Sequence, residues 1–189
     1  MSHLARVAPP ISPMTPQAYF AFEETTPLKH EYLDGVVYAM VGATDRHNII
    51  ALNLASALRA NKPAGCQVFI SDMKLKVKLT AAEYYYYPDI LVSCSGSDRE
   101  PLFREQPVLL VEVASPSTER IDRGEKLNAY RQIDSLSEYV IVSQDRAGIE
   151  VFRRRNGWFR EILNADEALV LECLGLTLSG EQIYDEVTF

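Results

Sequence analysis

Two short apolar stretches of the chain each carry one acidic residue. Residues 88–94 read Pro-Asp-Ile-Leu-Val-Ser-Cys, and residues 108–114 read Val-Leu-Leu-Val-Glu-Val-Ala. Runs of this length predict strands, and the second is apolar enough to be a strand buried on both faces. A carboxylate there, Glu112, is costly to bury unless a cation or hydrogen-bond donors meet it. The pattern therefore predicts a metal ion or a buried positive side chain beside Glu112.

The rest of the hydrophobic pattern predicts short helices and strands. Helices are expected over residues 16–24, 46–60 and 122–133. Their starting signals are Thr15 with Pro16, then Thr44 or Asp45, and finally Asp122 with Glu125 as a capping pair. Turn dipeptides at 34–35 and 156–157, Asp-Gly and Asn-Gly, predict hairpins. Residues 67–79 alternate as one strand with a solvent-facing side, and residues 138–143 form another strand.

Composition fits one globular domain. Of the 189 residues, 47% are hydrophobic and 24% are charged, an ordinary balance that supplies a core. The proline-rich residues 1–14 predict a flexible N-terminal arm, and residues 15–189 predict a single domain. The formal net charge of -7 argues against a protein that coats nucleic acid by bulk attraction. It leaves room for an enzyme that approaches phosphates through a bound cation.

Cysteine usage predicts a cytoplasmic protein with reduced thiols. Cys66, Cys94 and Cys173 are far apart and form no Cys-x-x-Cys or Cys/His cluster. That spacing argues against structural zinc and against a disulfide scaffold, so we expect partly buried free thiols. No apolar run approaches the roughly 18–20 residues that cross a membrane. The first residues also lack the apolar core of a signal peptide.

Asp89 and Glu112 predict a divalent-cation site if their strands are neighbours. Asp89 follows a proline at a strand mouth, and period-two alternation puts Glu112 on one face of its own strand. Two carboxylates on one side repel each other unless a cation neutralises them, and their hard oxygens suit Mg²⁺ or Mn²⁺. Lys126, which shares a helix face with Tyr130, is the candidate cation near the attacking water. Each residue also has a plainer interpretation. Asp89 is then a turn-forming residue after proline, Glu112 is a buried acid in a salt bridge, and Lys126 is a solvated helix lysine.

Here the chain resembles the PD-(D/E)XK nuclease superfamily and, within it, the Uma-type family of putative restriction endonucleases, which is abundant in cyanobacteria. The resemblance covers roughly residues 15–165. The phrases that carry it are Glu-Tyr-Leu-Asp-Gly at 31–35, His47 opening a helix, Tyr-Pro-Asp at 87–89, Val-Glu-Val-Ala-Ser-Pro-Ser-Thr at 111–118 and Asp-Arg-Gly-Glu-Lys-Leu at 122–127.

The resemblance implies an α/β (α+β) fold: a restriction-endonuclease-like mixed central β-sheet flanked by helices, with N-terminal and C-terminal β-hairpins. It implies an endonuclease dependent on Mg²⁺ (or Mn²⁺), with Asp89 and Glu112 as metal ligands. The superfamily places its lysine two residues after the acid, where this chain has Ala114. The Uma-type branch moves that lysine into the following helix, which selects Lys126. By motif, Glu31 matches the acid that precedes the core.

Some roles and partners stay open at this point. His47 is a proton carrier, a neighbour of the metal, or simply a hydrogen-bonded histidine, and Glu31 pairs with a lysine as readily as it acts in catalysis. The expected partner is nucleic acid, as double-stranded DNA, and a two-fold homodimer suits a duplex substrate. The main alternative is a catalytically degenerate, dimeric binding or regulatory module of the same fold. A phosphohydrolase acting on small molecules is a third reading.

Overall fold

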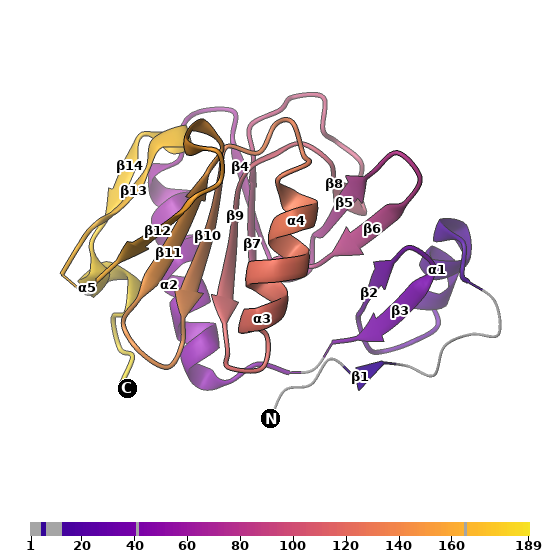
Figure 1. The fold of residues 1–189 in the computed structure, drawn as a ribbon, viewed down its shortest axis with the longest axis horizontal. Coiled ribbons are helices and arrows are strands. Elements are labelled where there is room, and N and C mark those ends of the chain that lie inside the picture. Colours follow the sequence, from indigo (N-terminus) through magenta and orange to yellow (C-terminus); the bar gives the residue numbers. More distant parts are fainter. Residues whose placement is uncertain (1–4, 7–12, 41, 165) are drawn as a thin grey trace.

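The computed structural model describes residues 5–6, 13–40, 42–164 and 166–189, and a six-stranded mixed sheet forms its centre (Figure 1). From edge to edge the strands are β12 (Arg160–Leu163), β11 (Ile149–Arg153), β10 (Glu138–Ser143), β9 (Pro107–Ala114), β7 (Ile90–Ser93) and β4 (Gln67–Ile70). β9 and β10 run parallel, whereas the other neighbouring pairs are antiparallel. The mixed central sheet predicted from the sequence is therefore confirmed.

β9 lies in the middle of this sheet, and helices cover both of its faces (Figure 1). On one face, α2 (Asp45–Asn61) packs Ile50 and Leu54 into the same core as Val111. On the other face lies one continuous helical segment, made of α3 (Glu119–Ile121), the π-helical turn η1 (Asp122–Lys126) and α4 (Leu127–Tyr130). Burial on both sides explains the nearly unbroken apolar run of β9.

A second six-stranded sheet lies beside the first and was not predicted. Its order is β1 (Ala5–Arg6), β3 (Val36–Ala39), β2 (His30–Leu33), β6 (Glu83–Tyr86), β5 (Lys74–Lys78) and β8 (Phe103–Arg104). The helix α1 (Pro16–Glu23), capped by Thr15 as expected, packs Tyr19 against Tyr32 and Tyr85 of this sheet. The predicted hairpin at residues 30–40 forms β2 and β3, with Asp34 and Gly35 at positive φ.

Residues 67–79 are not one strand, which corrects the prediction. β4 belongs to the central sheet and β5 to the second sheet, because the chain turns between them at Ser71, whose φ is 47°. Neither glycine nor proline marks this turn; the sequence shows it only as a change of phase, from apolar residues at even positions (Val68, Ile70) to apolar residues at odd positions (Leu75, Val77). The chain ends in β13 (Leu169–Leu171), β14 (Leu176–Leu178) and α5 (Gly180–Ile183), and the 3₁₀ turns η2 (Arg154–Asn156) and η3 (Glu172–Leu174) link neighbouring strands.

The helix expected over residues 122–133 begins earlier and ends earlier. It starts at Glu119 and its last α-helical residue is Tyr130. Asp122 is therefore not a cap: it is buried inside the helical segment, at the first position of the π-turn. Most of the predicted flexible arm, residues 1–4 and 7–12, lies outside the described residues. In the described part of the chain no helix is both long and apolar enough to span a membrane.

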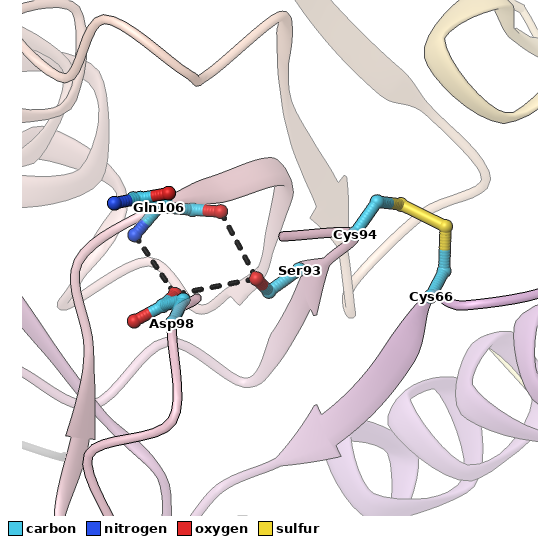
Figure 2. The surroundings of a disulfide bond; sticks show 5 residues. All are labelled: Cys66, Ser93, Cys94, Asp98 and Gln106. Carbon is cyan, nitrogen blue, oxygen red and sulfur yellow. Dashed lines mark hydrogen bonds between the residues drawn. A yellow bond between two sulfur atoms is a disulfide. The ribbon is translucent and has the colours of Figure 1, made fainter. Parts of the chain in front are cut away.

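Two of the three cysteines form a disulfide, so the prediction of free thiols is wrong for them. Cys66 and Cys94 are bonded to each other, and Cys173 is a partly buried free thiol. Figure 2 shows the bond beside β7, where the hydroxyl of Ser93 donates to Asp98 at 3.2 Å. β4 and β7 pair through Gln67 and Ser93, so the cysteines come together one residue beyond the end of this ladder. Strand register, rather than spacing along the chain, makes the pair.

Reduction of this disulfide is expected to destabilise the fold. The bond closes a loop of 28 residues, and the lost constraint on the unfolded chain corresponds to about 3–4 kcal/mol. Urea unfolding of the native chain, with and without a phosphine reductant, measures the difference. The Cys66→Ala/Cys94→Ala chain is the control and should not respond to the reductant. An equal response of both chains would show that the bond contributes nothing.

Candidate active site

Asp89, one residue before β7, and Glu112, on the neighbouring strand β9, line the same cavity of the central sheet. The register of β7 with β9 pairs Ile90 with Val111, and one further step places Asp89 opposite Glu112. Glu112 is only 3% exposed, and both residues line one cavity of about 350 Å³. Val113 donates its backbone N–H to Asp89 Oδ2 at 2.7 Å, and His47 Nε2 lies 3.1 Å from the same oxygen. The two carboxylates are close enough that the charge of Asp89 adds to burial in raising the pKa of Glu112.

Lys126 reaches this pair from the helix across the sheet face. Its ammonium lies 2.9 Å from Glu112 Oε1, and the hydroxyl of Tyr130 donates to the same oxygen at 2.9 Å. Lys126 and Tyr130 thus share a helix face, as predicted, and both meet Glu112. The lysine is 7% exposed, so the plain alternative of a solvated surface lysine is wrong. Ala114, two residues after Glu112 on the strand, has no charged side chain, so the ammonium beside Glu112 comes from the helix.

Glu31 enters the same cavity from the second sheet. It lies on β2, its Oε1 is 3.8 Å from the ammonium of Lys126, and it accepts the backbone N–H of Tyr87 at 3.3 Å. The acid thus joins the group through the packing of one sheet against the other. The structure brings all five sequence-predicted residues together around one cavity: Glu31, His47, Asp89, Glu112 and Lys126. Their chemical roles stay predictions.

Sequence reasoning missed Asp122, the third carboxylate that meets the lysine. Asp122 Oδ1 lies 3.3 Å from the ammonium of Lys126, and the residue lines the same cavity. Asp122 with Glu125 three residues later reads as a helix cap, and this interpretation hid it. The four-residue spacing from Asp122 to Lys126, which puts both on one helix face, was the signal that could have found it.

Burial and excess negative charge dominate the electrostatics of the cavity. Burial raises the pKa of Glu112 well above its ordinary value, the charges of Asp122 and Asp89 raise it further, and Lys126 opposes them. Burial likewise raises the pKa of Glu31. Burial alone would lower the pKa of Lys126, but the carboxylates of Glu112, Asp122 and Glu31 raise it well above its ordinary value. The ammonium is therefore held charged among carboxylates that outnumber it.

The pKa of His47 depends on its contact with Asp89. Burial would lower the pKa of His47, but its hydrogen bond with Asp89 and the charge of that residue outweigh burial and raise it. The cap of α2 fixes its position, because Thr44 Oγ1 accepts the backbone N–H of His47. Within the described residues its other ring nitrogen, Nδ1, is buried without a hydrogen-bond partner. His47 thus holds Asp89 in place and keeps one nitrogen uncommitted.

The donor set fits a divalent cation that keeps part of its water shell. Among the described residues, no three His, Cys, Asp or Glu side chains already converge in metal-holding geometry. Mg²⁺, however, is commonly held by one or two carboxylates together with water and substrate phosphate. The hydrogen bonds to Asp89 both end on Oδ2, and the described donors to Glu112 end on Oε1. Each carboxylate therefore retains a second oxygen for a cation, and the excess negative charge favours one.

Comparisons with known proteins give the chain a family and relatives. Residues 16–181 match the family model described as "Uma2: Putative restriction endonuclease". Two uncharacterized proteins of Synechocystis are similar: slr1290 is 35% identical over 95% of this chain and 96% of its own length, and sll1609 is 29% identical over 75% and 81%. The crystal structure of a putative nuclease of the DUF820 family from Anabaena variabilis covers 86% of this chain and 93% of its own, with a TM-score of 0.71 and 17% identity. At that identity the likeness shows the fold.

The raised pKa values of Glu112 and Glu31 predict how stability depends on pH without metal. Above the ordinary value of 4.5, the folded chain binds more protons than the unfolded chain, so its free energy of unfolding falls as pH rises. Replacing Glu112 by Gln removes one of these groups. Urea unfolding in EDTA between about pH 5 and about pH 8 should therefore show a smaller loss for Glu112→Gln than for the native chain. Parallel curves would contradict this account of Glu112.

Proposed function

The chain belongs to the Uma2 family of putative restriction endonucleases, and from this membership we propose that it is a Mg²⁺-dependent endonuclease that hydrolyses phosphodiester bonds in double-stranded DNA. One observation carries the proposal. Asp89, Glu112 and the ammonium of Lys126 meet in one cavity although they come from two strands and a helix. Burial of so many charges is costly, and clusters of this kind are typical of catalytic sites.

Asp89 and Glu112 would hold the cation. A divalent cation there supplies positive charge to the phosphate and lowers the pKa of nearby water. The backbone N–H of Val113 and the ring of His47 fix the carboxylate of Asp89, and Tyr130 fixes that of Glu112. These contacts keep the two carboxylates oriented before a substrate arrives, which reduces the cost of reorganisation during the reaction.

Lys126 would stabilise the negative charge that develops on the phosphate. Its raised pKa keeps it protonated at neutral pH, so it acts as a fixed cation rather than as a base. Glu31 would orient the ammonium from the opposite side, since its carboxylate lies 3.8 Å away. His47 is the residue placed to carry a proton, because it lines the cavity and its ring nitrogen Nδ1 has no hydrogen-bond partner among the described residues. Cytoplasmic location and the homodimer stay predictions.

Divalent-metal binding tests the premise of this proposal. We expect the native chain to bind Mn²⁺, and Glu112→Gln or Asp89→Asn to weaken binding by at least about tenfold because each removes a carboxylate from the site. Calorimetric titration with MnCl₂ measures the affinity. Glu125→Gln is the matched control, since it removes a negative charge from an exposed residue of the same helical segment. Equal affinity in Glu112→Gln and the native chain would remove the premise.

Plasmid cleavage separates a nuclease from a degenerate binding module. With Mg²⁺ present, Lys126→Met is expected to slow nicking of supercoiled plasmid by about 10²–10³-fold, because the ammonium no longer stabilises the phosphate charge. Binding of Mn²⁺ should survive, since Lys126 supplies no ligand. Asp89→Asn should abolish both. A native chain that binds Mn²⁺ and DNA yet cleaves neither plasmid nor oligonucleotide would favour the binding module instead.

A further inference from the structure

Lys126 contacts two carboxylates, those of Glu112 and Asp122, which differ in the hydrogen bonds that they accept. Its ammonium is 2.9 Å from Glu112 Oε1 and 3.3 Å from Asp122 Oδ1. Glu112 Oε1 also accepts the hydroxyl of Tyr130, whereas Asp122 Oδ1 is buried and accepts no hydrogen bond from any described residue. The 3.3 Å contact to Asp122 is thus an ionic approach without hydrogen-bond geometry. A buried carboxylate oxygen that accepts no hydrogen bond is costly, so Asp122 Oδ1 is an acceptor that could still take a donor.

The backbone holds Asp122 in this position. Asp122 opens the π-helical turn η1, and its carbonyl accepts the N–H of Leu127 across that turn. The hydroxyl of Tyr139, on β10, donates to the same carbonyl at 3.2 Å. Turns of this kind are rare and often occur at functional sites. The carboxylate of Asp122 is only 2% exposed, so a local side-chain donor must come from within the cavity, and Lys126 is the donor within reach.

A cation on Glu112 changes what the ammonium meets. Without metal, Glu112 Oε1 is the carboxylate oxygen closest to the ammonium of Lys126, at 2.9 Å. A dication on the same carboxylate would repel the ammonium at short range, because like charges a few ångströms apart interact strongly inside a protein. The ammonium then needs another acceptor, and the nearest described carboxylate oxygen beyond Glu112 is Asp122 Oδ1.

We propose that Asp122 is a positioning residue: it is the acceptor to which the ammonium of Lys126 shifts when a divalent cation binds Glu112. This inference rests on the proposed function. Asp122 then acts on the metal through Lys126 and not as a ligand. After the shift the ammonium no longer competes with the cation for the carboxylate of Glu112. The charged lysine stays inside the cavity, beside Asp122, which lies four residues earlier in the same helical segment.

A double-mutant cycle on metal affinity tests the proposal. The full chain is titrated with MnCl₂ as native protein, Asp122→Asn, Lys126→Met and the double variant. Without Asp122 the ammonium stays on Glu112 and competes with the cation, so Asp122→Asn should weaken Mn²⁺ binding by about tenfold in the native background. In the Lys126→Met background there is no ammonium to relocate, and the same substitution should change the affinity less than about twofold. Glu125→Gln controls for the lost charge.

Each other result overturns the inference. Equal weakening in both backgrounds would make Asp122 a ligand or a simple source of negative field. No weakening in the native background would show that the ammonium does not need Asp122. These outcomes differ from failure of the proposed function, which would appear as a native chain that does not bind Mn²⁺ at all and would remove both proposals together.

A second measurement serves if Lys126→Met does not fold. In full-length protein with ¹³C-labelled lysine, MgCl₂ should shift one ε-carbon resonance in the native chain and in Glu125→Gln, because the buried ammonium changes its partner. The shift should be smaller by about half or more in Asp122→Asn, where the nearer of the two remaining carboxylates is lost and only that of Glu31, 3.8 Å away, is left. Lysine resonances that do not respond to Mg²⁺, in a chain shown to bind it by calorimetry, would overturn the proposal.

Discussion

The buried ion pair between Lys126 and Glu112 is the contact on which the candidate site depends. Both groups are almost fully removed from water, and desolvation of each costs several kcal/mol in general. The pair alone does not balance the charges near Lys126, since three further carboxylates also line the cavity, those of Glu31, Asp89 and Asp122. Such an arrangement is poorly suited to stability alone. It is well suited to a site that receives a cation, because the missing positive charge is then supplied by the ligand.

Two sheets are needed to build this cavity. The central sheet supplies Asp89 and Glu112, while Glu31 comes from β2 in the second sheet, and the helical segment between β9 and β10 brings Lys126. The chain passes from the central sheet to the second sheet at Ser71, whose N–H donates to the carbonyl of Asp89 at 3.0 Å. Ser71 also lines the cavity, so one of the crossings between the sheets lies at the site.

Much of this arrangement follows from local pattern. Period-two alternation set the facing of Glu112, the proline set Asp89 at a strand mouth, and four-residue spacing put Lys126 and Tyr130 on one helix face. What the sequence could not supply depends on tertiary register. The Cys66–Cys94 bond arises from the pairing of β4 with β7, across 28 residues. The break at Ser71 carries no glycine or proline. Asp122 imitates a cap because Glu125 follows three residues later, and the earlier helix start at Glu119 is not evident from the sequence.

The position of the lysine is a consequence of packing as much as of chemistry. Ala114 stands two residues beyond Glu112 on the same face of β9, where the superfamily pattern places the lysine. Here it is buried in the same cluster as Ala129 and Tyr130 of the helical segment. Small residues on both sides let the helix approach the sheet closely, and a long side chain at Ala114 would overpack that contact. With the helix packed at Ala114, the ammonium that meets Glu112 comes from the helix itself, from Lys126. The π-helical turn that carries Lys126 and the small residue at Ala114 therefore act together: the alanine makes room for the helical segment, and the turn supplies the ammonium.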